Sequence, residues 1–502
     1  MGCDAPAPLA DPIKASGRAT SGSRTVRYSA AGVICSKATT MLLPQALSNG
    51  GNLLQVRPDG DEEDREMAAT IAAIPSLRTH TASYARRALW IMFAINFLNY
   101  MDRFILPAAL SSIKKDFSLS DLQLGSLATA FTLVYAVAAL PFGIWADRGI
   151  RKNVIAVGVG LWSVATLFTG AATGFATLFA SRAAVGIGEA GYYPAGTSLL
   201  VDYFPKERRA WMLGLWNVGA SLGVAVGFIV GGVVADRYGW RWAFYLTAGP
   251  GLICTALAYR MREPRRGGES ATPMHGLDTA NTSVAPPFAE AARRILRIPT
   301  MRVALAAQTL NFFVLGAAVL WFPTLLQRRY AINESEAGLI SGGLLVGAGI
   351  IGTLGGGWLA DRLMPRIPSA RLLVTGLAFI ASAPLLVLSL GAPSLALCAP
   401  IFFLGGICLQ AYNGPMSALM QDVVAPELRA VAVAISLIVA HVLGDAFSPS
   451  LVGGLSDLMG HDLAAAMRLT LPAVILAAGV ICLLGLRRVA PDMLALEAQG
   501  RV

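Results

Sequence analysis

The chain has 502 residues, of which 55% are hydrophobic and only 14% are charged, and its formal net charge at pH 7 is +10. Soluble globular domains carry about 25% charged residues, so this composition excludes an ordinary soluble fold and indicates an integral membrane protein. The positive excess does not indicate nucleic-acid binding, because Lys and Arg are concentrated in alternate short loops between apolar runs, as in cytosolic loops of membrane proteins.

Twelve apolar runs have a length of about 20 residues, which a helix needs to cross a bilayer. In chain order these predicted spans lie at 88–113, 124–146, 153–173, 175–201, 210–235, 241–260, 301–326, 337–360, 370–391, 394–420, 428–455 and 467–486. Placing the basic loops in the cytosol puts both termini there as well. The predicted fold class is an all-α polytopic membrane protein with twelve transmembrane helices in two six-helix bundles.

The remaining segments divide the chain. Residues 1–87 are rich in small and polar residues, include the acidic run "DGDEEDRE", and are predicted to form a disordered cytosolic tail. A transit peptide within this tail, or a true start at Met67, stays open. Residues 88–260 and 301–488 are predicted to form the two bundles. The polar segment 261–300 is predicted to be a cytosolic linker, and 489–502 a second cytosolic tail.

The two predicted bundles share loop sequences in corresponding places. Span two ends in "FGIWADRGIRK" and its counterpart, span eight, ends in "GGWLADRLMPR". The loop after span four reads "DYFPKERRA", and the loop after span ten reads "DVVAPELRA". Six helices repeated in the same orientation are typical of a secondary transporter built around a central site.

Four ionisable residues interrupt the apolar spans. Asp102 and Arg103 lie in "NFLNYMDRFILP" of span one, and Arg182 and Glu189 lie on one face of span four. At 1.5 Å per residue, Asp102 lies roughly 16 Å and Arg182 roughly 10 Å from the outer ends of their spans, depths at which they can meet. An unpaired charge at mid-membrane costs about 2.5–3.5 kcal/mol, so these residues are expected to be paired or to line a wet cavity.

The paired charges suggest a coupling device. A carboxylate held by an arginine can exchange protons when substrate takes its partner, so Asp102 and Glu189 are predicted to carry the proton. Arg103 and Arg182 are predicted to bind an anionic head group, because a guanidinium binds phosphate and carboxylate in a bidentate manner. A static buried salt-bridge network is the alternative.

Other polar and aromatic residues in the spans are secondary candidates. His441 and Asp445 share a helix face in span eleven and form a second polar cluster, with stabilisation of a kink as the alternative. A further set is predicted to line the cavity, with ordinary helix packing as the alternative: Tyr192, Tyr193, Asn311, Tyr412 and Asn413.

Several motifs carry a family resemblance. The loop residues Gly143, Asp147, Arg148, Arg151 and Lys152 resemble the signature of the major facilitator superfamily, with Ile150 where the general pattern has glycine. In that family the glycine permits close helix packing, and the aspartate and basic residues form an ion-pair latch at a cytosolic gate.

A narrower resemblance covers about residues 88–488. The stretches "NYMDRF", "R-x6-EA-x-Y" beginning at Arg182, "GPMSALMQDVVAPELRAVAVAIS" and "HVLGDAFSPSLVGGLSD" are similar to the Spinster family. The resemblance implies that Asp102, Arg103, Arg182 and Glu189 form the polar cluster for proton coupling and head-group binding. It also implies amphiphilic lipid substrates such as lysophospholipids and sphingoid phosphates.

The expected function is therefore proton-coupled secondary transport of an anionic amphiphile by alternating access. A proton symporter for small carboxylates and a non-transporting membrane sensor are the alternatives. The protein is not expected to be an enzyme, to hold a metal or cofactor, or to bind nucleic acid. Its expected partners are membrane lipids, the proton and the substrate, and a monomer is expected. The membrane is expected to be the plasma or inner membrane, with an organelle membrane left open.

Overall fold

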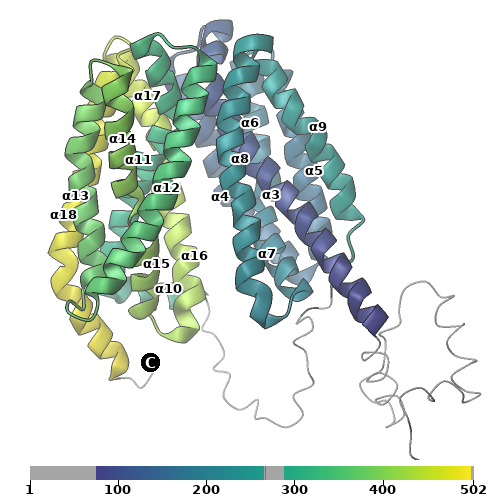
Figure 1. The fold of residues 1–502 in the computed structure, drawn as a ribbon, viewed down its shortest axis with the longest axis vertical. Coiled ribbons are helices and arrows are strands. Elements are labelled where there is room, and N and C mark those ends of the chain that lie inside the picture. The colour runs from purple at the N-terminus through teal and green to yellow at the C-terminus, as the bar shows by residue number, and fades with distance from the viewer. Residues whose placement is uncertain (1–74, 265, 267–287, 499–502) are drawn as a thin grey trace, which may run out of the picture. The chain divides into compact units, whose positions relative to one another are not determined.

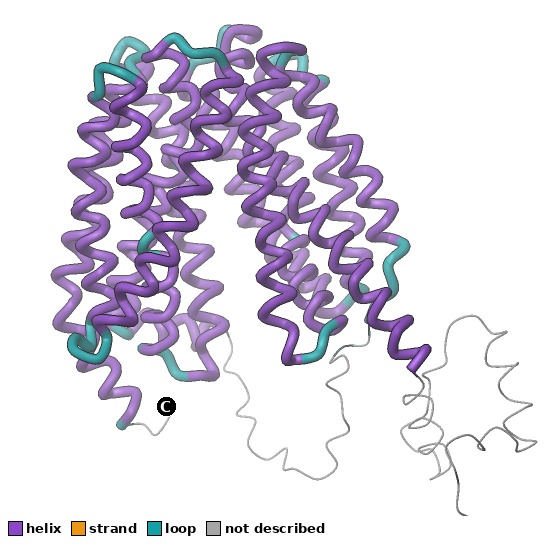
Figure 2. Tube along the Cα trace, viewed as in Figure 1, coloured by secondary structure: helices purple, strands orange, loops and turns teal. Residues whose placement is uncertain are grey.

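The computed structural model describes residues 75–264, 266 and 288–498, with side chains placed from Ser83 onward except that of Lys206. Within these residues the chain is built from helices joined by loops, without a β-strand (Figure 2). The chain divides into two compact units, and the second unit, Ala82–Val502, holds the helices that position the site.

The helices follow one another with short connections except across the linker (Figure 1). The helices before the linker are α3 (Pro75–Phe117), α4 (Asp121–Arg148), α5 (Arg151–Gly170), α6 (Phe175–Ala190), α7 (Tyr192–Tyr203), η1 (Lys206–Arg208), α8 (Arg209–Tyr238) and α9 (Trp240–Tyr259). Those after it begin with α10 (Phe288–Arg297), α11 (Pro299–Tyr330), α12 (Glu334–Leu363), α13 (Ala370–Gly391), α14 (Leu395–Gln410) and α15 (Asn413–Asp422). The chain continues with η4 (Pro426–Leu428), α16 (Arg429–Ala440), the π-helical turn η5 (His441–Asp445), α17 (Ser448–Leu458) and α18 (Leu463–Glu497).

The prediction of an all-helical membrane fold is confirmed. Among the described residues, ten helices are long and apolar enough to cross a membrane. The two other predicted spans correspond to α6 with α7 and to α9, which are not among those ten. Span four is divided at Gly191 into helices of 16 and 12 residues, each shorter than a bilayer crossing requires.

Three helical segments extend beyond the predicted spans. α3 begins at Pro75, inside the segment expected to be disordered, and α18 continues to Glu497, inside the predicted tail. The predicted linker contains α10, whose Ala291 and Ile295 are buried while three arginines lie on its polar side. Residues 1–74 and 267–287, on which the rest of the tail and linker predictions fall, lie outside the described residues.

The helices pack in two groups that follow chain order. Before the linker, α5 packs on α6 and α9, and α4 packs on α6. After the linker, α13 and α11 pack on α18, and α14 packs on α12 and α13. The groups meet where α8 packs on α12 and α4 packs on α17. We call the groups the first half (α3–α9) and the second half (α10–α18).

Two glycines bring α6 close to its neighbours. A Cβ atom added to Gly186 would lie 2.5 Å from the Phe131 carbonyl oxygen of α4, and one added to Gly188 would lie 2.4 Å from the Trp162 nitrogen of α5. Helix backbones approach this closely only where small residues face the neighbour. These glycines hold α6, with its two charged residues, in the middle of the first half.

Candidate functional site

Asp102 and Arg182 form a buried ion pair between α3 and α6. Both side chains are 2% exposed, and Arg182 Nη1 lies 3.7 Å from Asp102 Oδ2. Two hydroxyl groups complete the environment of the carboxylate: Thr166 Oγ1 of α5 donates to Oδ2 at 3.0 Å, and Thr247 Oγ1 of α9 donates to Oδ1 at 3.5 Å. Four helices therefore converge on this one carboxylate.

Arg103 and Glu189 form the second pair between the same two helices. Arg103 Nε donates to Glu189 Oε2 at 2.5 Å, and the glutamate side chain is fully buried while the arginine side chain is 25% exposed. Three rings also lie about the Arg103 guanidinium, with ring centroids 5.1–5.5 Å away: Tyr100, Phe131 and Tyr135. Cation–π contacts of this kind hold a guanidinium in place without neutralising it.

The site retains unused hydrogen-bonding capacity. Among the described residues, Nε and Nη1 of Arg182 and Oε1 of Glu189 have no hydrogen-bond partner, although all three atoms are buried. Leaving such atoms unpaired is unfavourable. The site therefore presents donors and an acceptor to a polar ligand, a proton or water.

The structure brings all four predicted residues together. The depth argument from the sequence anticipated that Asp102 and Arg182 can meet, and the helical spacing placed Glu189 on the same face as Arg182. The residues that complete the site and were missed are Thr166, Thr247, Tyr100, Phe131 and Tyr135. Threonines and aromatic residues are common in apolar helices, so neither kind carries a signal in a single sequence.

The second polar cluster lies on the π-helical turn η5. His441 Nδ1 lies 2.8 Å from Asp445 Oδ2, and the imidazole meets the ring of Phe312 edge-on at 5.0 Å. Asn311 of α11 is fully buried, and neither of its amide atoms has a hydrogen-bond partner among the described residues. π-Helical turns often occur at functional sites, but the pair is also consistent with stabilising the local bend.

The remaining cavity-lining candidates separate by exposure. Tyr192 is 1% exposed, and its hydroxyl donates to Met92 O and accepts from Trp216 Nε1, so it packs inside the first half. Tyr412 is 6% exposed and is also a packing residue. Tyr193 is 45% exposed and stacks on Trp216. Asn413 is half-buried and donates to Thr353 Oγ1 at 3.1 Å.

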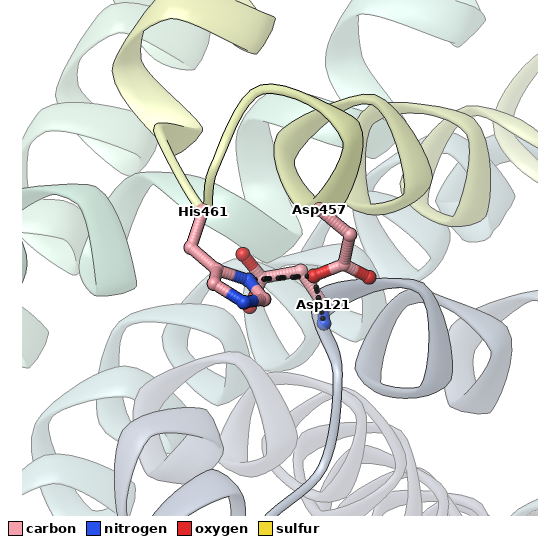
Figure 3. A group of neighbouring side chains, drawn as sticks. All are labelled: Asp121, Asp457 and His461. Atoms are coloured by element: carbon pink, nitrogen blue, oxygen red, sulfur yellow. Dashed lines mark hydrogen bonds and ion pairs between the residues drawn. The ribbon is translucent and has the colours of Figure 1, made fainter.

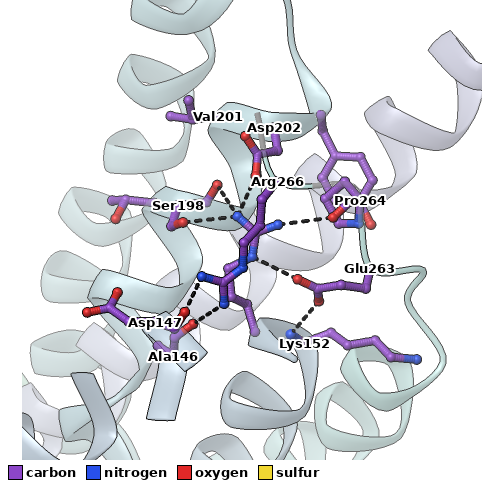
Figure 4. A network of polar contacts seen from close by, with 12 residues as sticks. Ala146, Asp147, Lys152, Ser198, Val201, Asp202, Glu263, Pro264 and Arg266 are labelled. Carbon is purple, nitrogen blue, oxygen red and sulfur yellow. Dashed lines mark hydrogen bonds and ion pairs between the residues drawn. The ribbon is translucent and has the colours of Figure 1, made fainter. Parts of the chain in front are cut away.

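A polar network lies at the start of α5, and Figure 4 labels Ser198, Asp202 and Glu263 among its members. Its central residue is Arg151, the first residue of α5. Arg151 is 2% exposed, and its guanidinium donates to Asp202 Oδ2 at 2.5 Å and to Glu263 Oε1 at 2.7 Å. The Lys152 backbone nitrogen donates to Glu263, and the Lys152 ammonium donates to Tyr259 O at 3.1 Å. This network ties α5, α7 and the segment after α9 together within the first half.

The structure differs in two details from the ion-pair latch expected from the sequence. The side chains of Asp147 and Arg148 are both exposed. Arg266 donates a hydrogen bond to the backbone oxygen of Asp147 and not to its carboxylate. The carboxylates that pair with Arg151 are instead those of Asp202 and Glu263. A Cβ atom added to Gly143 would meet no described atom within 4 Å, so this glycine makes no close helix contact in this conformation.

The second half repeats the Arg151 contact. Arg371, at the start of α13, pairs with Asp422 at the end of α15, as Arg151 at the start of α5 pairs with Asp202 near the end of α7. Arg371 also lies 3.8 Å from Asp361 of the repeated "ADR" sequence. The internal repeat seen in the loops is therefore a repeat of contacts.

Comparisons with known proteins agree with this architecture. The sequence model of the Major Facilitator Superfamily matches residues 92–449. Protein spinster homolog 1 of Xenopus tropicalis is 33% identical over 387 residues, covering 73% of this chain and 72% of the relative. Protein spinster homolog 1 of Homo sapiens is 33% identical over 390 residues, with the same shares covered.

A solved structure shows the same fold. The crystal structure of a bacterial homologue of the human lysosomal transporter Spinster, inward-facing and unoccupied, matches with a TM-score of 0.71 and 25% identity. The match covers 82% of this chain and 97% of that one. The predicted family is confirmed, and the relatives are transporters. The chain therefore belongs to the Spinster family of the Major Facilitator Superfamily, and it is a membrane transporter and not an enzyme.

Proposed function

We propose that this chain is a proton-coupled secondary transporter that moves an anionic amphiphile by alternating access. The observation that carries the proposal is the pair of ion pairs between α3 and α6, Asp102 with Arg182 and Arg103 with Glu189. Two acids and two arginines have no net charge together. A bound anion therefore leaves the site with an uncompensated negative charge, which binding of a proton to a carboxylate removes.

Arg103 and Arg182 are the proposed head-group ligands. Nε and Nη1 of Arg182, which have no hydrogen-bond partner among the described residues, are donors that a phosphate or carboxylate satisfies. Asp102 and Glu189 are the proposed proton carriers, because each is held by an arginine that the substrate competes for. Binding of substrate to the arginines weakens their hold on the carboxylates, so the affinity for protons rises.

An apolar cavity supports the choice of an amphiphile. It is lined by residues of α8, α11, α12 and α14, among them Phe228, Leu315, Phe322, Leu344 and Phe402. The ring of Phe228 lies 5.2 Å from that of Phe104, the neighbour of Arg103 in the sequence. A head group at the arginines and an acyl chain along these rings suit a single-chain lipid.

We propose the following topology for this cycle. α6 with α7 and α9 complete twelve spans with the ten apolar helices, and both termini lie in the cytosol, as the distribution of basic loop residues favours. The bundles are residues 88–260 and 301–488. The end of α4 and the start of α5 then lie on the cytosolic face, where the gate region is formed by Gly143, Asp147, Arg148, Arg151 and Lys152. His441 and Asp445 form the secondary polar cluster, and the protein acts as a monomer.

Counterflow in proteoliposomes tests the transport class and the substrate together. Vesicles preloaded with unlabelled oleoyl lysophosphatidylglycerol are expected to accumulate the labelled lipid transiently, because a transporter exchanges it across the membrane. The same assay with a panel of small aliphatic and aromatic carboxylates distinguishes the lipid transporter from the alternative, a proton symporter for small carboxylates. That symporter would exchange these acids and not the lipid. Binding of the lipid without counterflow of any compound would instead favour a membrane sensor.

A further inference from the structure

Asp121, at the start of α4, is a buried carboxylate that ties the two halves together. It is fully buried and takes hydrogen bonds from three other helices. Arg328 of α11 donates from Nη1 to Oδ2 at 2.8 Å and from Nη2 to Oδ1 at 2.6 Å. Lys114 of α3 donates to Oδ1 at 2.6 Å, and Ser456 of α17 donates to Oδ2 at 2.7 Å. The bidentate arginine and the serine belong to the second half.

A second carboxylate crosses the same boundary in the opposite direction (Figure 3). Asp457 of α17 accepts from the backbone nitrogen of Asp121 at 2.9 Å and from that of Leu122 at 2.8 Å. The first turn of α4 leaves such N–H groups without partners inside the helix. A residue of the second half therefore caps a helix of the first, and His461 Nδ1, 2.9 Å from Asp457 Oδ1, holds that carboxylate.

The helix backbones touch beside these charges. A Cβ atom added to Gly125 of α4 would lie 2.3 Å from Pro449 O, and one added to Gly453 of α17 would lie 2.3 Å from Asp121 O. One turn beyond Gly125 on α4, the hydroxyls of Thr129 and Ser450 lie 2.6 Å apart. The α4–α17 seam is closed along about two helical turns of α4.

The opposite end of the molecule has a different pattern. There, among the described residues, the ion pairs join helices within one half: Arg151 with Asp202 and Glu263 in the first, and Arg371 with Asp361 and Asp422 in the second. In the part of the chain that the structure describes, the ion pair that joins the halves, Arg328 with Asp121, lies at the end where α3 meets α4.

We infer that Asp121, Arg328, Lys114, Ser456 and Asp457 form the extracytosolic gate of the transporter, which we call the Asp121 clamp. A site between two halves reaches the far face only when the halves separate at that face, and these contacts join them there. Separation admits water, which can solvate each charge, so the clamp can open and close. The inference rests on the transporter class and on the proposed topology for naming the face, and it does not depend on the substrate or on proton coupling.

Distance measurements test the clamp without any substrate. Spin labels are placed at Lys115→Cys on α3 and Leu458→Cys on α17, both exposed, in a cysteine-free background. Arg328→Gln is expected to add a population with a longer label-to-label distance, because the bidentate bond between the halves is lost. The matched control is Arg329→Gln, since Arg329 donates to the carbonyls of Gly391 and Ala392, both within its own half. An unchanged distribution in folded Arg328→Gln protein would overturn the inference.

A reversible lock tests whether the seam must open. Thr129→Cys with Ser450→Cys is expected to form a disulfide on oxidation, because the native hydroxyls touch. Oxidation should abolish counterflow of labelled oleoyl lysophosphatidylglycerol, and reduction should restore it. Full counterflow by the oxidised, cross-linked protein would contradict a gate, as would a pair that cannot be cross-linked. If the wild type does not move this lipid, the substrate proposal fails while the distance measurement still decides the clamp.

Discussion

The two ion pairs of the central site differ in how tightly they are held. Arg103 and Glu189 share a short hydrogen bond, whereas Arg182 and Asp102 lie 3.7 Å apart and the aspartate takes its hydrogen bonds from threonines. Buried charges in an apolar surrounding persist only when paired. Among the described residues, the looser pair is the one whose arginine has N–H groups without a hydrogen-bond partner, which supports the proposal that Arg182 binds the anion.

The Asp102–Arg182 pair predicts a stability change. Arg182→Gln leaves Asp102 buried without its cation, and breaking a buried pair from one side costs about 3–5 kcal/mol. The detergent-solubilised variant is therefore expected to unfold at a clearly lower temperature than the wild type. Asp102→Asn added to Arg182→Gln should recover part of the loss, because no buried charge remains unpaired. A double variant whose loss of stability relative to the wild type equals the sum of the losses of the two single variants would contradict direct pairing.

Most helices were predictable because the bilayer sets the length and the apolarity of a span. The points at which two predicted spans are divided into shorter helices were not predictable in this way. Span four divides at Gly191 and span ten divides between Gln410 and Asn413. Each was predicted as one helix because its total length suits a bilayer crossing. α10 was missed because its ten residues are too short and too polar to register as a span. Its sequence is amphipathic, and in the structure its side with Ala291 and Ile295 is buried where it packs on α11 and α16.

Close packing of α6 predicts the effect of a single methyl group. Gly188→Ala places a Cβ atom 2.4 Å from Trp162 N and 2.8 Å from Gly158 O, which are backbone atoms that cannot move aside alone. Overpacking of this kind costs about 1–3 kcal/mol, so a lower unfolding temperature is expected. Gly214→Ala in α8 is the matched control: its Cβ meets no described atom within 4 Å, and alanine favours a helix by about 0.5–1 kcal/mol. Equal stability of the two variants would contradict the packing.

At the scale of the whole molecule, the sequence predicted the symmetry but not the conformation. The repeated loops anticipated the two halves, and the matching pairs Arg151–Asp202 and Arg371–Asp422 give that repeat a structural meaning. The cross-half contacts of Asp121 had no sequence signal, because its partners Arg328 and Ser456 are distant in the chain and look like ordinary residues at helix ends. One sequence must also serve every state of a transport cycle, so pattern alone cannot select one of them.

Proton movement driven by substrate tests the central claim most directly. Proteoliposomes containing a pH-sensitive dye are given oleoyl lysophosphatidylglycerol, and the luminal pH is followed for the wild type, Asp102→Asn, Glu189→Gln and the control Asp116→Asn. Asp116 also lies on α3, but it pairs with Arg241 at a half-exposed position away from the site. The wild type and the control are expected to couple lipid flux to a pH change. At least one of the variants Asp102→Asn and Glu189→Gln is expected to exchange lipid without a pH change. An undiminished pH change in both variants would contradict proton coupling at this site.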